Sequence, residues 1–480
     1  MKAKSSILWI CLLTVSCLSS FAQVDKSLEQ QVDSIFQSFD NDYTPGVAVG
    51  FIKDNEWILS KTYGMANLDY QVPVSDSSVF SLASVSKQFT AFGILLLKEQ
   101  GRLSLEDDIR NYLPLFKDYG TVITIRMLIE HTSGIRSHLS LLGQAGYYPD
   151  DVITASTVHD AIYRQESLNF TPDADFSYSN SGYFLLAEII EKVSGQSFAA
   201  FMQKEILTAL NMNDSFVMDN YNTIVSNKAT SYGLQGDQYA TATANYSYYG
   251  STNLYTSLRD LSKWVQNFTQ PKIGNTAMFQ QLNQQFALKS DESFRYNMGQ
   301  FHSTWNGLPC IQHSGADAGY RAFLGRFLEQ RAAVFIISGN GTLDAQAKAE
   351  EVAHLFLKSY YPAKKSKTSV ATNTTNEETL TDTYEYATEE LNQFEGCYYS
   401  KELRTIYSIR LVDEHITVQQ RQFGTIQLNT LSEDQFSSTS WQFQTLHFER
   451  NDDSEVIGFR INAPRAQGVH FEKIRLNNCH

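Results

Sequence analysis

Two strand-turn-strand patterns, far apart in the sequence, constrain the fold most strongly. Residues 46–63 place two apolar runs on either side of Asp54-Asn55, and residues 320–338 repeat this arrangement around Glu329-Gln330. Apolar runs that flank a short polar turn are typical of β-hairpins. We therefore expect the first 360 residues to form one antiparallel sheet, to which both ends of that segment contribute strands.

The region between the two hairpins has helical patterns instead. Apolar residues recur there at helical spacing, with a glycine after two of the segments and Ser197 as an N-cap before the third. The expected helices span residues 84–100, 183–194 and 198–210. The predicted fold class is α/β: an antiparallel β-sheet flanked by helices, with an inserted helical region.

A second, smaller module is predicted at the C-terminus. Residues 363–388 are rich in Lys, Ser, Thr, Asn and Glu, which is typical of a linker. Residues 389–480 contain short alternating segments with turn residues between them, a pattern that indicates a small antiparallel β-barrel. The larger unit would then span residues 23–362.

The first 22 residues have the pattern of a secretory signal peptide. A short basic segment precedes an apolar run at 7–15 that is too short to span a bilayer, and Ser20-Phe21-Ala22 fits a small-x-small cleavage site. We expect export to the periplasm or the extracellular space. A retained membrane anchor and lipidation of Cys17 are the alternatives.

Charge and cysteine content exclude several classes of protein. The chain has 38 Lys+Arg and 52 Asp+Glu, a net charge of −14, which disfavours nucleic-acid binding and long-range attraction of anionic substrates. Of the five cysteines, Cys310, Cys397 and Cys479 lie outside the leader, and none has CxxC spacing. Cys397 and Cys479 could pair if the two ends of the small module meet, or could remain buried thiols.

Ser84-Val85-Ser86-Lys87 is the first candidate for chemistry. On a helix, residues three apart share one face with Cβ atoms about 5–6 Å apart, so the lysine amine can reach the serine hydroxyl. A serine needs a base to become a nucleophile, and a partly buried amine can have its pKa lowered for that role. HExxH, GxGxxG, Walker A and GxSxG motifs do not occur in the sequence.

Two polar triplets follow Ser84 in the chain. Tyr178-Ser179-Asn180 lies in a polar loop just before the predicted helix at 183–194, and His313-Ser314-Gly315 precedes the second hairpin. An SxxK motif, a second polar triplet and a Lys/His-Ser/Thr-Gly strand in this order form a three-motif active site. In a folded chain these three elements would converge around one pocket.

Together these motifs resemble the serine β-lactamase and penicillin-binding superfamily, in its class C branch. That branch includes class C β-lactamases, D-alanyl-D-alanine carboxypeptidases, D-aminopeptidases and related esterases. Residues 128–134 (Leu-Ile-Glu-His-Thr-Ser-Gly), 183–190 and 315–321 also look like segments of that branch. The resemblance covers about residues 30–360, and the C-terminal module is similar to the lipocalin-like barrels of some members.

The resemblance implies a role for each matched residue. Ser84 would be the acylated nucleophile, and Lys87 would hydrogen-bond to it and keep Ser84 or Tyr178 deprotonated. Tyr178 would act as general base and acid, with Lys87 and His313 as the cations available to lower its pKa. Asn180 would orient Lys87 and the substrate amide.

The third motif would bind the substrate. The backbone N–H groups of Ser84 and Ala316 would form the oxyanion hole, while Ser314 and Gly315 would line the strand along which the substrate lies. His131, in the loop at 128–134, receives no catalytic role and is expected to be a hydrogen-bonded loop histidine. The resemblance implies no metal or organic cofactor.

His313 departs from the β-lactamase form, which has lysine at this position. Histidine is mostly neutral at pH 7, so efficient β-lactam hydrolysis is disfavoured. We expect a serine hydrolase that acts on esters or on D-amino-acid amides and peptides. Weak β-lactamase activity is an additional possibility within this interpretation. The alternative is an inert penicillin-binding fold that senses cell-wall fragments, with the barrel's aromatic side chains as a binding surface rather than a core.

Overall fold

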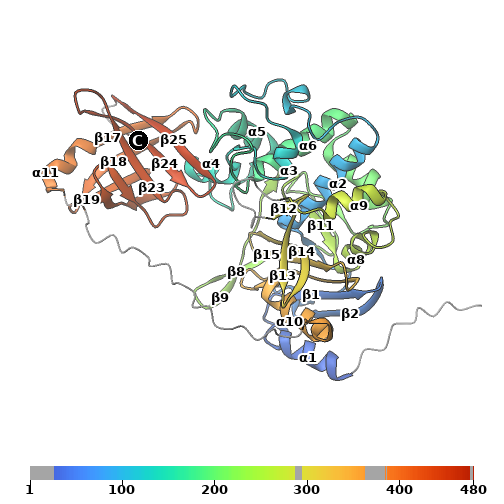
Figure 1. Ribbon diagram of the computed structural model, residues 1–480. Helices are drawn as coiled ribbons and strands as arrows, with labels where there is room; N and C mark the ends of the chain where they lie inside the picture. The colour runs from blue at the N-terminus through green and yellow to red at the C-terminus, as the bar shows by residue number, and fades with distance from the viewer. Residues whose placement is uncertain (1–25, 287–294, 363–383, 385, 476–478, 480) are drawn as a thin grey trace, which may run out of the picture.

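The first and last strands of the large unit lie side by side in one sheet. The computed structural model describes residues 26–286, 295–362, 384, 386–475 and 479. Its seven-stranded sheet has the order β12-β13-β14-β15-β16-β1-β2 (Figure 1). β1 (Val47–Lys53) pairs antiparallel with both β2 (Glu56–Tyr63) and β16 (Ala332–Ser338). The predicted sheet, built from both ends of the segment, is therefore confirmed.

Both faces of this sheet are covered by helices. Along β1, Val47, Val49 and Phe51 pack in one hydrophobic cluster with α1 (Lys26–Phe36) and α10 (Ala345–Leu357). The alternate residues Ala48 and Ile52 belong to the larger cluster on the opposite face. Successive side chains of a strand point to opposite faces, so a fully buried strand such as β1 is apolar at nearly every position.

The helical region covers the second face and carries the site. Its central helix is α6 (Asn180–Ser194), which packs against α2 (Ser86–Glu99) and ends at Gly195 in the left-handed conformation. Ser197 caps α7 (Phe198–Met202) by accepting a bond from the Ala200 N–H, as predicted. The remaining helices of this region are α3 (Ile125–Ile129), α4 (His138–Ala145), α5 (Ala155–Tyr163), α8 (Leu258–Asn267) and α9 (Thr276–Asn283), with the 3-10 helices η2 (Ala83–Val85) and η3 (Ile109–Asn111) and the π-helix η4 (Gln203–Thr208). Two further 3-10 helices, η1 (Gln37–Phe39) and η5 (Lys358–Tyr360), directly follow α1 and α10.

Short strands complete the large unit. Four strands of the main sheet are β12 (Tyr296–Asn297), β13 (Gln300–Trp305), β14 (Leu308–Asp317) and β15 (Tyr320–Phe327). The minor strands are β3 (Met65–Asn67), β4 (Val72–Pro73), β5 (Val79–Ser81), β6 (Ile153–Thr154), β7 (Phe216–Val217), β8 (Tyr232–Gln235), β9 (Gln238–Thr241), β10 (Tyr246–Ser247) and β11 (Leu254–Ser257).

The C-terminal module is a nearly closed antiparallel barrel of nine strands, in the order β20-β19-β18-β17-β25-β24-β23-β22-β21. Aromatic rings fill its interior, among them Tyr398, Tyr407, Phe448 and Phe459. The barrel is preceded by α11 (Thr388–Leu391) and η6 (Asn392–Phe394), and its strands are β17 (Gly396–Ser400), β18 (Thr405–Val412), β19 (His415–Gln420), β20 (Gly424–Gln427), β21 (Asn429–Ser432), β22 (Gln435–Ser437), β23 (Thr445–Arg450), β24 (Val456–Ala463) and β25 (Ala466–Ile474).

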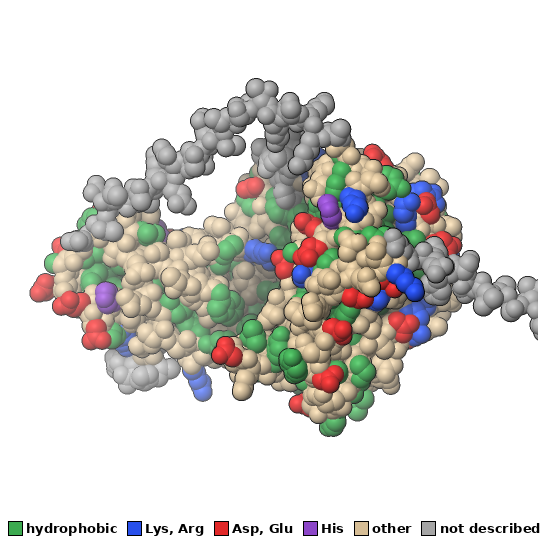
Figure 2. All heavy atoms as spheres, turned by 90° about the horizontal axis from the view of Figure 1, so that it is seen from below, with side chains coloured by type: hydrophobic (Ala, Val, Ile, Leu, Met, Phe, Trp, Pro, Cys, Tyr) green, Lys and Arg blue, Asp and Glu red, His purple; other side chains and the backbone are tan. Residues whose placement is uncertain are grey.

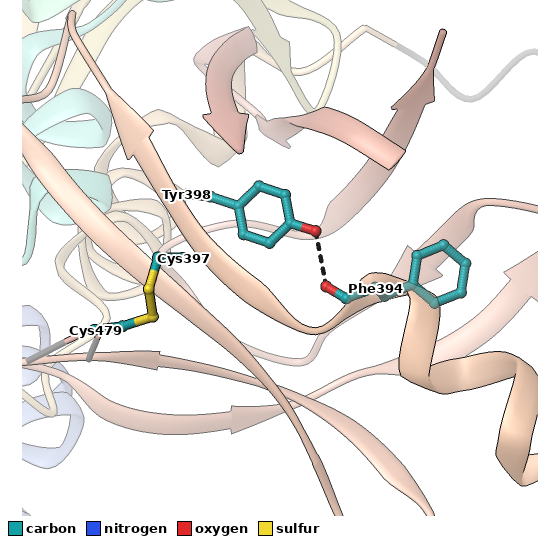
Figure 3. Close-up of a disulfide and its surroundings, with 4 residues drawn as sticks. All are labelled: Phe394, Cys397, Tyr398 and Cys479. Atoms are coloured by element: carbon teal, nitrogen blue, oxygen red, sulfur yellow. Dashed lines mark hydrogen bonds between the residues drawn. A yellow bond between two sulfur atoms is a disulfide. The ribbon is translucent and has the colours of Figure 1, made fainter. Parts of the chain in front are cut away.

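A disulfide ties the end of the chain to the first strand of the barrel. Cys397 of β17 bonds to Cys479, with 5.5 Å between the Cα atoms (Figure 3). Next to it, the Tyr398 hydroxyl donates to the Phe394 carbonyl at 2.7 Å, which fixes the entry into β17 (Figure 3). Of the two possibilities left open by the sequence, the structure has the pair, while Cys310 is a buried free thiol.

The barrel is docked on α4 and α5 through a buried ion pair. Nη1 of Arg136 donates to both carboxylate oxygens of Glu402, at 2.7 and 2.9 Å, and the two side chains are only 1% and 4% exposed. The Tyr407 hydroxyl donates to the Gln144 carbonyl at 2.6 Å, and Trp441 packs on Gly143. A cavity of about 1670 Å³ remains between these elements, and Figure 2 shows the surface hollowed where the two parts meet.

Two predictions concern residues that the structure does not describe. The expected signal peptide at 1–22 lies outside the described residues, and so does the expected linker at 363–388 apart from residues 384 and 386–388. Among the described helices, none is both long and apolar enough to cross a bilayer.

The Arg136–Glu402 pair makes a testable contribution to stability. Replacing Glu402 by Ala leaves a buried guanidinium without its counter-charge, so we expect the free energy of unfolding to fall by about 3–5 kcal/mol in denaturant titrations. The control Glu351→Ala removes one partner of an exposed pair on α10 and should cost less than about 0.5 kcal/mol. Equal losses in the two variants would contradict the role given to the buried pair.

Candidate active site

Ser84 lies in a tight turn just before α2. Its predecessor Ala83 has a φ of 45°, in the left-handed region that residues with a Cβ rarely adopt, and the Ala83 N–H donates to Ser81 Oγ at 3.1 Å. Ser84 is half-buried. The turn packs directly against β14, where a Cβ on Gly315 would overlap the Leu82 carbonyl oxygen. The absent side chain of Gly315 therefore allows the nucleophile turn to reach the strand.

Lys87 is fully buried and lies against Ser84. Its Nζ donates to Ser84 Oγ at 3.0 Å and to the Ser251 carbonyl at 2.7 Å. The predicted contact across one helical turn is therefore present. Burial lowers the pKa of Lys87 well below its ordinary value, while the nearby Asp317 carboxylate opposes that shift. The lowered pKa favours the neutral amine, which can accept a proton.

Tyr178 reaches the site from the loop before α6. Its hydroxyl lies 3.5 Å from His313 Nε2, and Lys87 Nζ lies 4.9 Å from the centre of its ring. The sequence predicts that neighbouring cations lower the pKa of this phenol. Burial instead raises the pKa of Tyr178, and the interaction with Ser84 only partly opposes this effect. The half-buried phenol is therefore a proton donor at neutral pH.

His313 lies in β14 beside Tyr178. The imidazole is 3% exposed, and burial together with the Lys87 charge lowers its pKa to about 3. Its Nδ1 faces the Ser314 carbonyl at 2.5 Å. The sequence predicts a mostly neutral histidine here, and the buried environment favours the neutral form further.

The other predicted residues surround this centre. Asn180 is the first residue of α6 and is buried, but among the described contacts it has no hydrogen bond to Lys87, which is held by Ser84 and Ser251 instead. On β14, Ser314 and Ala316 are exposed, whereas Gly315 is buried against the nucleophile turn. Ser84, Lys87, Tyr178 and His313 thus come from three chain segments and contact one another, while Asn180 follows Tyr178 by two residues at the start of α6.

Four further groups near the site were missed by sequence reasoning or given no role. The Ser251 carbonyl holds Lys87, and Asp317, whose pKa burial raises to about 6, acts on the Lys87 charge. His131 Nδ1 accepts from the Ser179 N–H at 3.1 Å, and its ring packs 4.4 Å from that of Tyr178. Arg465 comes from the barrel, 4.7 Å from the Tyr178 ring. Two of these groups carried a local signal: Asp317 follows His313 by four residues, and His131 lies in the segment 128–134 that resembles the family.

Two features together define the class of penicillin-binding serine hydrolases. One is an antiparallel sheet flanked by helices, and the other is a serine that is hydrogen-bonded to a buried lysine three residues further along the chain. Within that class, the family profile described as Beta-lactamase matches residues 32–356. The chain belongs to the β-lactamase family. Its members are serine hydrolases. Separately, no cluster of three or more His, Cys, Asp or Glu side chains among the described residues could hold a metal ion.

Known proteins support this assignment at modest sequence identity. Protein flp of Staphylococcus aureus is 28% identical over 312 residues, which cover 62% of this chain and 60% of that protein. This chain therefore spans about three fifths of the length of such curated relatives.

Solved structures share the fold. The octameric penicillin-binding protein homologue from Pyrococcus abyssi superposes with a TM-score of 0.62 at 21% identity, covering 93% of this chain and 99% of that one. The D-amino acid amidase from Ochrobactrum anthropi SV3 superposes with a TM-score of 0.58 at 18% identity, over 70% of this chain and 99% of that one. The first of these matches extends over the barrel as well as the large unit, because it covers nearly the whole chain.

The close approach of β14 to the nucleophile turn can be tested with Gly315→Ala. The added Cβ overlaps the Leu82 carbonyl, so we expect Ser84 to move relative to Lys87 and the rate of fluorophosphonate labelling to fall about 100-fold. Gly233→Ala in β8 is the control, because its Cβ would make only an ordinary contact, 3.7 Å from Ala242. An unchanged labelling rate for Gly315→Ala would contradict this account.

Proposed function

We propose that the protein is an exported serine hydrolase that forms an acyl-enzyme on Ser84 and acts on an ester or a D-amino-acid amide or peptide. The observation that carries the proposal is the 3.0 Å hydrogen bond between Lys87 Nζ and Ser84 Oγ, made by an amine that is wholly buried. A neutral amine at this distance is a general base placed for the serine proton.

The reaction would proceed by acyl transfer in two steps. Lys87 accepts the Ser84 proton as Oγ attacks the carbonyl carbon, and the backbone N–H groups of Ser84 and Ala316 would hold the resulting oxyanion. When the tetrahedral intermediate collapses, the protonated Lys87 or the Tyr178 hydroxyl protonates the departing alcohol or amine. A water molecule then attacks the carbonyl carbon of the acyl-enzyme, and its proton passes through the same groups to Ser84 Oγ. The carboxylic acid and free Ser84 are the products.

The neutral third motif suits ester and amide substrates that make no carboxylate contact with β14. With its pKa near 3, His313 supplies no permanent charge at the position where the β-lactamase form has lysine. A D-amino acid amidase is among the proteins that share this fold, which supports amides of D-amino acids as candidate substrates. The proposed export depends on residues 1–22 and on the resemblance of the family to penicillin-binding proteins.

Intact-mass measurement tests the acyl-enzyme. The wild-type protein incubated with a fluorophosphonate should gain the mass of one adduct, and Ser84→Ala should gain none. Lys87→Ala keeps the nucleophile without its base, so its labelling rate should fall about 10³-fold or more. Absence of an adduct on the wild type would reject the hydrolase proposal and favour the inert binding alternative. An adduct that persists on Ser84→Ala would place the nucleophile elsewhere.

The charge of Asp317 should shift the pH profile in a defined direction. Its carboxylate raises the pKa of Lys87, so Asp317→Asn should lower the Lys87 pKa and move the acid limb of kcat/KM for nitrophenyl acetate to lower pH. Because the pKa of Asp317 itself is about 6, its carboxylate is charged mainly above that pH. The pH profiles of the wild type and of Asp317→Asn should therefore differ mainly above pH 6. Asp413→Asn, in the turn between β18 and β19, is the control and should leave the limb in place. A shift to higher pH would contradict the assignment.

A further inference from the structure

The turn between β24 and β25 brings one barrel residue to the catalytic site. The Arg465 carbonyl accepts from the Ser137 N–H at 2.9 Å and from Asn169 Nδ2 at 3.4 Å, and Asn169 Oδ1 accepts in turn from the Gln467 N–H at 2.8 Å. These bonds attach Arg465 and Gln467 to the helical region. The backbone of this residue is therefore fixed with respect to the catalytic unit.

The side chain of Arg465 extends from this turn over Tyr178. The centre of its guanidinium lies 4.7 Å from the centre of the Tyr178 ring, which is within cation–π range. Its charge acts on the catalytic groups, since it lowers the pKa of both Lys87 and Tyr178. Arg465 thus lies next to the groups that would handle the substrate, although it belongs to the other module.

Arg465 also retains its capacity to bind an anion. The residue is exposed, and in the described part of the chain no Asp or Glu carboxylate forms an ion pair with its guanidinium. Three arginines of the barrel and its interface are instead paired, Arg136 with Glu402, Arg450 with Asp434 and Arg460 with Glu449. An arginine held by its backbone beside a reactive serine, with its planar donors unpaired, is suited to a carboxylate.

We propose that Arg465 is a specificity-determining residue that binds a carboxylate of the substrate next to the bond that is cleaved. This inference rests on the proposed function of the Ser84 site and adds the substrate class, an acyl compound with a free carboxylate. Arg465 would then supply from the barrel the fixed positive charge that neutral His313 does not supply from β14. The net negative charge of the chain disfavours long-range attraction of anions, so the selection would act at short range.

The barrel's position is a requirement of this arrangement. The buried Arg136–Glu402 pair lies beside the same turn, because a Cβ on Gly468 would come within 3.8 Å of Arg136 Nη2. Ser137, which donates to the Arg465 carbonyl, follows Arg136 directly in the chain. The contacts that dock the barrel therefore also set the position of Arg465 over the site.

Binding to a protein that cannot turn over tests the proposal separately from catalysis. In the Ser84→Ala background, isothermal titration with N-acetyl-D-alanyl-D-alanine and with its C-terminal amide compares a carboxylate with a neutral group of the same shape. We expect the carboxylate to bind about tenfold more tightly, and Arg465→Gln to abolish that difference. Arg465→Lys should restore part of it, and the matched control Arg460→Gln, on the neighbouring strand, should retain it.

The outcomes separate the two proposals. Three outcomes would overturn the role of Arg465. The acid and the amide could bind equally to the protein that contains Arg465, the acid could fail to bind, or the preference for the acid could survive Arg465→Gln. A preference that depends on Arg465, together with absence of a fluorophosphonate adduct on wild type, would uphold the anion site and reject the hydrolase. In an active enzyme, Arg465→Gln should reduce the ratio of kcat/KM for nitrophenyl hemisuccinate to kcat/KM for nitrophenyl acetate about tenfold, because the effect of its charge on Lys87 and Tyr178 is common to both substrates, whereas Arg460→Gln should leave this ratio unchanged.

Discussion

The burial of the Lys87 amine is the constraint on which the rest of the site depends. The amine is out of contact with water, and its polar partners are Ser84 Oγ and the Ser251 carbonyl, so the elements that carry these atoms must stay closed around it. The β12–β13 turn also packs on the backbone of α2, where a Cβ on Gly299 would come within 2.6 Å of the Lys87 carbonyl carbon. The same close packing around Lys87 therefore both holds these elements together and lowers the pKa of the amine that activates Ser84.

The barrel takes part in the site as well as extending the chain. Its aromatic interior is packed, so its contribution lies in its outer turns and in the surface docked on α4 and α5. The disulfide between Cys397 and Cys479 holds the first strand of the barrel to the end of the chain, close to the strands that carry Arg465. A module that looks separable in the sequence is thus docked on the helical region by a buried ion pair and further contacts, and its β24–β25 turn reaches the active site.

Much of the fold could be predicted from local patterns. The hairpin around Asp54-Asn55 has both residues in the left-handed conformation that such a turn requires, and Gly195 and Ser197 end and begin helices as expected. The charge states could not be predicted in the same way. Neighbouring cations were expected to lower the Tyr178 pKa, but the depth of burial, which no spacing reveals, raises it instead.

The sequence by itself determined the fold class, the serine and lysine on one helical face, and the order of the three motifs, because these depend on periodicity and on residues close in the chain. Only the tertiary structure decided that Ser251 holds Lys87, that Cys397 pairs with Cys479 and that Arg465 lies over Tyr178. Each of these contacts joins residues far apart in the chain, and its partner is selected by packing of the whole molecule, which leaves no local pattern.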